Sequence, residues 1–282
     1  MKLVFCVFSY QKDLPLLVNC VRSVNRLKDL YPEHDIKLAV VNDLNDPISK
    51  EDMPVVDIVK ETGWKRGFNL SDCENIFGQI EVYKNLMEET ESSILIKIDS
   101  DTMMTRLDWV HNLIGSGSWG MWGTSCWGRY CSICGYFYAM DKETVDAVYD
   151  LTRDDKIASR IRSTVQGMVL EDRVYTQLVS IAHARGMINK GVGYVVLDSE
   201  SFAKSLADGT DKVKHSNYGA EWRKGWFDQV EPYKDMIAVT FKRRGKTDDI
   251  IQEALEGMNA FWGVIKDLPR WDKKEDLNPE QA

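Results

Sequence analysis

Long hydrophobic runs are missing from this chain of 282 residues. No stretch approaches the roughly 18 to 20 apolar residues that a helix needs to cross a bilayer, so we expect no integral membrane segment. An excess of basic residues is missing as well, because 36 Lys and Arg stand against 44 Asp and Glu, which gives a net charge of -8. Nonspecific binding along nucleic acid requires a basic surface, and we therefore do not expect it.

Cysteine and histidine are scarce, at six and four residues. Cys126, Cys131 and Cys134 have the spacing C-x4-C-x2-C, which also occurs in iron–sulfur proteins. Because aromatic and apolar residues surround them and no fourth cysteine follows, we interpret them as buried thiols. The apolar run 2–8 is too short for a signal sequence and is typical of a strand, which favours a cytoplasmic protein with reduced cysteines.

What the chain does contain is an alternation of strand and helix patterns. Hydrophobic residues make up 44% of the sequence, enough for a packed core. Continuous apolar runs predict strands at residues 2–9, 36–42 and 55–59 and in the run that ends at Asp99, and helical stripes predict helices at 14–27 and around 76–87. Repeated strand–helix–strand units imply a mixed, mostly parallel sheet flanked by helices, which is the α/β class.

The second half of the chain is less regular. Strands are predicted at 136–140 and 192–197, and helices at 142–151, 171–185 and 248–265. The charged segment 153–164 and the polar segment 199–219 are expected to be loops, the first of them mobile, and the tail after residue 271 is expected to be loose. Since no linker is clear enough to separate two domains, we predict a single domain.

Two aspartates follow the apolar strand near residue 98. Asp99 and Asp101 are separated by Ser100 in a D-x-D motif. In an extended backbone the side chains alternate between faces, so both carboxylates would point the same way. Converging carboxylates suit a hard divalent cation, and open α/β sheets bind their ligands at the carboxyl ends of strands. The alternative is a turn with two solvated acids.

Polar residues also follow the first two strands. Ser9 and Tyr10 come at the end of the first strand, and Asp43 comes at the end of the second. In a doubly wound sheet these ends are neighbours, so an aromatic ring and a carboxylate could hold a nucleobase there. Each could instead be an ordinary turn residue.

A cationic loop precedes the second helix. Lys65 and Arg66 lie between Gly63 and Gly67, where they could meet a diphosphate or form a solvated pair. Asn69 is interpreted as the cap of the helix that follows.

Two further candidates lie in the second half. Glu171 and Asp172 open a predicted helix, where the helix dipole favours acids, but Asp172 could also be a general base that takes a proton from a hydroxyl. His215 lies in a polar segment. It is either solvated or a ligand for a transition-metal cation beside carboxylates.

Taken in order, these segments resemble the GT-A glycosyltransferases, in particular their inverting, family 2-like branch. The resemblance covers residues 1 to 200 and rests on Phe8-Ser9-Tyr10, Val40-Val41-Asn42-Asp43, the loop 63–69, Ile96-Lys97-Ile98-Asp99-Ser100-Asp101, Gly135-Tyr136-Phe137 and Glu171-Asp172. The segment 173–178 lacks a clear continuation of the family's acceptor-site pattern, and the chain beyond 200 has no counterpart. The acceptor therefore stays open between a glycan, a lipid, a protein and a modified nucleobase.

The resemblance implies a Rossmann-like GT-A fold and a metal-dependent transfer of sugar from a nucleoside diphosphate, such as UDP, to an acceptor hydroxyl with inversion. Residues 1–115 would bind the nucleotide-sugar, 116–246 would bind the acceptor and carry catalysis, and 247–282 would form a C-terminal helix and tail. The expected donor-binding residues are Phe8, Ser9, Tyr10, Asp43, Lys65, Arg66, Asp99 and Ser100. The metal, Mn²⁺ or Mg²⁺, is expected on Asp99, Asp101 and His215, and Asp172 with Glu171 is expected to activate the acceptor.

Two other functions fit parts of the pattern. In a haloacid dehalogenase-type phosphatase or phosphotransferase, Asp99 would attack phosphorus, Asp101 would be the acid/base, and Glu171-Asp172 would hold Mg²⁺. Against it, Met103 occupies the place of an expected Thr or Val, and about 90 residues of α/β pattern precede the motif. A non-catalytic module would bind nucleotide with metal but release neither sugar nor phosphate.

Overall fold

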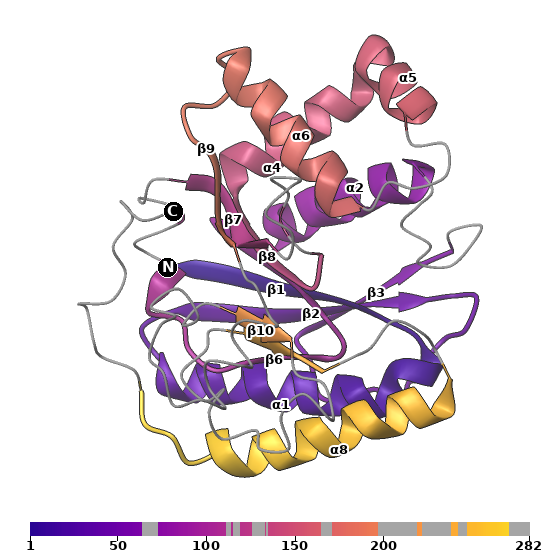
Figure 1. The fold of residues 1–282 in the computed structure, drawn as a ribbon, viewed down its shortest axis with the longest axis vertical. Coiled ribbons are helices and arrows are strands. Elements are labelled where there is room, and N and C mark those ends of the chain that lie inside the picture. Colours follow the sequence, from indigo (N-terminus) through magenta and orange to yellow (C-terminus); the bar gives the residue numbers. More distant parts are fainter. Residues whose placement is uncertain are drawn as a thin grey trace.

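A seven-stranded sheet runs through the computed structural model, which describes residues 1–63, 73–110, 114, 119–125, 133, 135–164, 171–196, 219–221, 238–241 and 247–270. The strand order is β3-β2-β1-β5-β8-β7-β9 (Figure 1). The strands are β1 (Lys2–Ser9), β2 (Asp35–Asp43), β3 (Ile58–Thr62), β5 (Ile94–Asp99), β7 (Trp119–Ser125), β8 (Phe137–Asp141) and β9 (Gly191–Val196). In this described sheet β8 runs antiparallel to both neighbours and the other pairs are parallel, which confirms the predicted mixed α/β class.

The central strands are apolar on both faces because helices cover both sides. Along β1, Leu3, Phe5 and Val7 belong to one core cluster, whereas Val4 and Cys6 belong to the other. A strand buried on both faces needs a continuous apolar run, and this is why the sequence pattern located β1, β2 and β5 closely.

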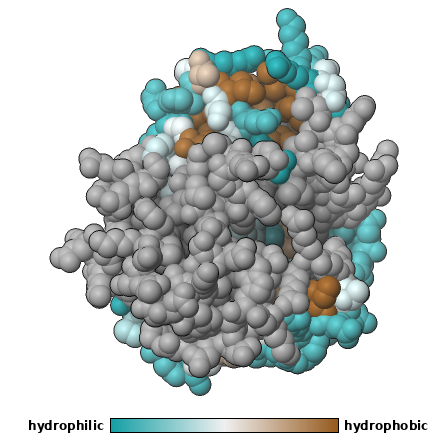
Figure 2. All heavy atoms as spheres, in the orientation of Figure 1, coloured by the Kyte–Doolittle hydropathy of each residue, from teal (hydrophilic) through white to brown (hydrophobic). Residues whose placement is uncertain are grey.

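Helices α1 (Leu14–Leu30) and α8 (Asp248–Ile265) cover one face, and α2 (Cys73–Glu89), α4 (Lys142–Arg153) and α6 (Glu171–Ala184) cover the other (Figure 1). Within the first layer, Asn19 Nδ2 donates a hydrogen bond of 3.0 Å to Asn259 Oδ1, which joins α1 to α8. Figure 2 shows hydrophilic side chains around a hydrophobic area at the end of the molecule that carries α5 (Asp155–Thr164) and α6. Among the described helices, none combines the length and the apolar character that a bilayer crossing demands.

A second, three-stranded sheet was not predicted. It consists of β10 (Gly219–Glu221), β11 (Ala238–Thr240) and β6 (Thr102–Met104), with β11 antiparallel to β6. Strands of three residues are too short to show a period. In addition, β6 and β11 are more than 100 residues apart in the chain. This sheet brings the chain beyond residue 200 against the segment that follows Asp99.

Two predicted elements need correction. The strand expected at 55–59 lies at Ile58–Thr62, and Val55 is 86% exposed. The side chain of Asp57 accepts the Leu38 N–H at 2.7 Å and pairs with Lys28, so it closes the chain against β2 just before the strand begins. β3 is short and half exposed, so the sequence pattern does not define where this strand begins.

The segment 153–164 is not a loop, because α5 occupies Asp155–Thr164. Asp154 Oδ1 accepts the backbone N–H groups of Lys156 and Ile157 at 2.9 and 3.2 Å, which caps the first turn. Ala158 is buried, so the charged sequence hides a narrow packed face. Most of the segment 199–219, the tail after 271 and Cys126, Cys131 and Cys134 lie outside the described residues, while Cys6 and Cys20 are buried free thiols.

Candidate functional site

The carboxyl ends of β1, β2 and β5 meet at one edge of the sheet. Phe8 is the register partner of Asp99, and Ser9 is the partner of Asn42. The parallel order therefore brings the predicted strand-end residues together, as expected from the alternation of strands and helices.

Asp99 and Asp101 do not share one extended strand. β5 ends at Asp99, and residues 100 and 101 form a turn that leads into β6. The alternation of side chains, which predicted that both carboxylates point the same way, therefore does not reach Asp101. Ser100 is buried in this turn and donates its hydroxyl to Asp13 Oδ2 at 3.2 Å, so its hydroxyl has a structural partner.

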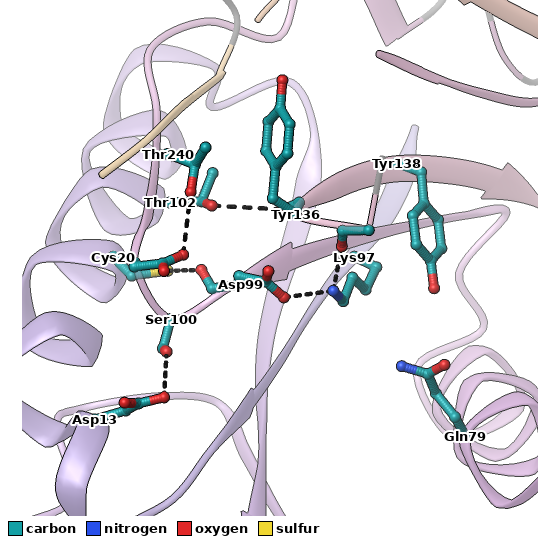
Figure 3. Close-up of polar contacts among 12 residues, drawn as sticks. Asp13, Cys20, Gln79, Lys97, Asp99, Ser100, Thr102, Tyr136, Tyr138 and Thr240 are labelled. Atoms are coloured by element: carbon teal, nitrogen blue, oxygen red, sulfur yellow. Dashed lines mark hydrogen bonds and ion pairs between the residues drawn. The ribbon is translucent and has the colours of Figure 1, made fainter. Parts of the chain in front are cut away.

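The Asp99 carboxylate pairs with a buried lysine. Lys97 Nζ lies 2.5 Å from Asp99 Oδ1; the Lys97 side chain is 1% exposed, and that of Asp99 is 45% exposed. The same ammonium donates to the carbonyl of Gly135 and lies 5.7 Å from the centre of the Tyr138 ring. Figure 3 shows the Asp99 carboxylate turned toward Lys97, with Thr240 on the other side of the strand end.

Asp101 is held from the second sheet. Its side chain is buried, and its Oδ1 accepts a hydrogen bond of 3.2 Å from Thr240 Oγ1. Its carbonyl accepts the Phe241 N–H at 3.0 Å. The end of β11 thus fixes both the backbone and the side chain of the second aspartate.

The buried thiol of Cys20 lies close to both Asp99 and Asp101. Cys20 Sγ donates to the Asp99 carbonyl at 3.7 Å. Burial raises the pKa of the Cys20 thiol well above its ordinary value, and the charges of Asp101 and then Asp99 raise it further. Both carboxylates therefore lie within electrostatic reach of one point under the strand ends.

The turn before β8 supports the motif from the side. The Tyr136 carbonyl accepts the Asp99 N–H at 3.0 Å and the Thr102 hydroxyl at 3.5 Å (Figure 3). Together with the bond from Lys97 to Gly135, these contacts clamp the chain on both sides of residues 100 and 101.

Acidic groups also surround Tyr10. Burial raises the pKa of the Tyr10 hydroxyl, and Asp13, Asp101 and Asp46 raise it further in that order of weight. Asp13 is buried and had not been singled out from the sequence, where it reads only as a residue before a helix. Tyr10 therefore lies close enough to the D-x-D turn for the charge of Asp101 to act on its hydroxyl.

The other predicted residues of the first two strand ends are mainly structural in this arrangement. Asp43 is buried, and its Oδ1 accepts the Asn45 N–H at 2.9 Å and the Asn45 side chain at 2.7 Å. Phe8 packs edge-on against Tyr83, with ring centres 6.0 Å apart. Ser9 Oγ is buried and has no hydrogen-bond partner among the described residues.

Some predicted residues cannot be placed. Lys65, Arg66, Asn69 and His215 lie outside the described residues. Glu171 and Asp172 open α6, but the description does not extend to their side chains.

The described residues offer few ligands for a cation. Within the described ranges, no three His, Cys, Asp or Glu side chains form a group that could hold a metal ion alone. Mg²⁺ usually binds one or two carboxylates and completes its shell with phosphate oxygens and water. Asp99, whose carboxylate is half exposed, and Asp101, which is buried, are the described residues that could supply such oxygens.

Lys97, Asp13 and Thr240 were not among the predicted site residues. Lys97 carried a readable signal, because it is a single charge inside an otherwise apolar strand and two residues before Asp99. Such a charge must find a partner on its own face of the sheet. Asp13 and Thr240 had no comparable signal.

No protein-family model matches the sequence, and no curated protein matches it. Three solved structures that align with most of the chain are glycosyltransferases. A glycosyltransferase involved in the glycosylation of the major capsid of PBCV-1 has 10% identity and a TM-score of 0.49, over 92% of this chain and 99% of its own. The galactosyltransferase LgtC, in complex with donor and acceptor sugar analogs, has 12% identity and a TM-score of 0.49. The alignment covers 95% of this chain and 98% of LgtC.

The third is the glycosyltransferase GlyE of Streptococcus pneumoniae TIGR4, with 14% identity and a TM-score of 0.45 over 94% of this chain. This chain spans 61% of the length of GlyE. At this level the likeness concerns the path of the chain and not its activity.

Proposed function

We propose that this protein is a glycosyltransferase that moves a sugar from a nucleoside diphosphate to an acceptor hydroxyl with the help of a divalent cation. One observation carries the proposal: the half-exposed Asp99 and the fixed Asp101 lie where the ends of β1, β2 and β5 meet. In an open α/β sheet this is the edge that receives ligands.

Asp99 and Asp101 would hold Mn²⁺ or Mg²⁺ against the diphosphate of the donor, and His215 is a further candidate ligand. The cation would offset the negative charge that develops on the leaving diphosphate. Because the chain has a net charge of -8, its own field repels a diphosphate, and this makes a cation at the site more useful.

Residues of this chain would do the remaining work. The ring of Tyr10 and the hydroxyl of Ser9, which has no hydrogen-bond partner among the described residues, would hold a base and ribose, such as those of UDP, at the end of β1. Lys65 and Arg66 would contact the diphosphate. Asp172, at the start of α6, would take the proton of the acceptor hydroxyl on the face opposite the leaving group, which gives inversion. The cytoplasmic setting stays a prediction.

The test is hydrolysis and transfer from a panel of nucleotide-sugars with Mn²⁺. Asp101→Ala and Asp172→Asn should each lower turnover at least about 100-fold, because one removes a cation ligand and the other removes the base. Glu143→Gln is the matched control, since Glu143 is an exposed acid on α4 at the opposite end of β5. Unchanged turnover in both active-site variants would refute the assignment.

Two assays on the same purified protein distinguish the phosphatase and the non-catalytic module from the glycosyltransferase. Release of 4-nitrophenol from its phosphate ester, abolished by Asp99→Asn, would favour the phosphatase. Binding of nucleotide with Mn²⁺ but release of neither sugar nor phosphate would favour the module. No described contact favours either of them over the glycosyltransferase.

A further inference from the structure

Lys97 is a fully buried cation directly beneath the proposed cation site. A buried ammonium is costly unless other groups compensate for the lost water. Its partners include the Asp99 carboxylate at 2.5 Å and the Gly135 carbonyl. The charge of Lys97 is felt nearby, because it acts against the burial that raises the pKa of the Cys6 thiol.

Lys97 and Asp99 share one face of the sheet because they are two residues apart in β5. On this face Lys97 also lies under the ring of Tyr138, which adds a favourable contact between cation and ring. The ammonium is therefore fixed, and it occupies Asp99 Oδ1 before any ligand arrives. At the motif itself, the charge of Lys97 therefore acts against that of Asp99.

We propose that Lys97 is a positioning residue that makes cation binding depend on the diphosphate. This inference rests on the proposed function. A divalent cation that approaches Asp99 meets a carboxylate already neutralised by Lys97 and is repelled by the ammonium. A diphosphate brings negative charge that offsets this repulsion, so cation and donor bind strongly only together. By linkage, the cation strengthens donor binding by the same factor.

The experiment measures Mn²⁺ binding by the loss of the free-ion paramagnetic resonance signal, without and with UDP. Lys97→Met removes the ammonium. Lys97→Gln removes the charge but keeps hydrogen-bond donors for Asp99 and Gly135, which separates charge from geometry. Asp99 is half exposed and can be solvated when its partner is lost, so both variants should fold, and thermal unfolding checks this. Asp101→Ala removes a proposed cation ligand and shows how much Mn²⁺ binding remains when the site is lost.

Both neutral variants should bind Mn²⁺ about tenfold more tightly than the parent in the absence of UDP, because a like charge next to the cation is removed. The strengthening of Mn²⁺ binding by UDP should shrink by the same factor. Lys190→Met is the control for net charge. Lys190 pairs with Asp141 at 3.6 Å, and Asp141 lies at the other end of the β5–β8 pair from Asp99. Lys190→Met should change the affinity for Mn²⁺ less than about twofold.

The outcomes separate the two proposals. If the parent binds no Mn²⁺ even with UDP, the cation site itself fails, and the inference fails with it. A second outcome is that the parent binds Mn²⁺ and Asp101→Ala does not, so that the cation site is present. If Lys97→Met and Lys97→Gln then bind Mn²⁺ no more tightly than Lys190→Met, only the role of Lys97 is overturned. A gain seen in Lys97→Gln suffices to support that role if Lys97→Met does not fold.

Discussion

The hydroxyl of Thr240 donates a hydrogen bond of 3.2 Å to Asp101 Oδ1, and the two residues are 139 positions apart in the chain. Thr240 is the register partner of Thr102 in the β11–β6 ladder, and Thr102 directly follows Asp101. The small second sheet therefore has a definite task, which is to hold the second aspartate of the motif from the C-terminal side.

Replacement of Thr240 by Val tests this connection. The variant keeps the shape of the side chain but removes a hydrogen bond to a buried carboxylate, so the free energy of unfolding should fall by about 1 to 2 kcal/mol. Urea unfolding measures it. Thr62→Val is the matched control, because the buried Thr62 hydroxyl has no hydrogen-bond partner among the described residues. A loss of equal size in both variants would contradict the role of the Thr240 bond.

The central sheet could be predicted because its strands are buried on both faces. Residues 3–9 of β1 are all buried, and such a run leaves a continuous apolar signal. The edge strand β3 alternates between exposed and partly buried positions over five residues, so its position was misjudged by three residues. Helix α5 was missed because most of its residues face solvent and only a narrow stripe is packed.

The site was predictable in position but not in orientation. Parallel order alone places Phe8 beside Asp99, and strand patterns reveal that order. The directions of the two carboxylates depend on the turn at residues 100 and 101 and on partners distant in sequence, namely Thr240 and the turn at Gly135. Local patterns hold no information on such contacts, and a sequence motif therefore does not by itself define the geometry of a site.

A glycine in β7 is needed for its close packing against β8. A Cβ on Gly123 would lie 2.5 Å from Ile133 and 2.9 Å from the Phe137 carbonyl, which is too close for either. We expect Gly123→Ala to lower the free energy of unfolding by about 1 to 3 kcal/mol, as overpacking usually does. Gly191→Ala in the neighbouring β9 is the control, since nothing lies within 4 Å of its added carbon. Equal midpoints of urea unfolding for the two variants would show that the β7–β8 contact yields easily.

Asp57 should make part of the stability depend on acid pH. Burial alone would raise the pKa of Asp57, but the hydrogen bonds from Lys28 and the Leu38 N–H outweigh it and leave the pKa below its ordinary value of 3.8. A carboxyl whose pKa is depressed in the folded state stabilises the fold above the unfolded pKa. That stabilisation is lost as the pH falls through the folded-state value.

Asp57→Asn should therefore be less stable than the parent at neutral pH. The gap should begin to close as the pH falls below about 4 and should narrow further as the pH falls through the folded-state pKa of Asp57. Urea unfolding of both proteins from pH 7 down to pH 3 measures the gap. Lys28, which lies 2.5 Å from Asp57, is unchanged in the variant, so the comparison isolates the carboxyl of Asp57. A gap that stays constant over the whole range would mean that the loss comes from packing and not from the charge of Asp57.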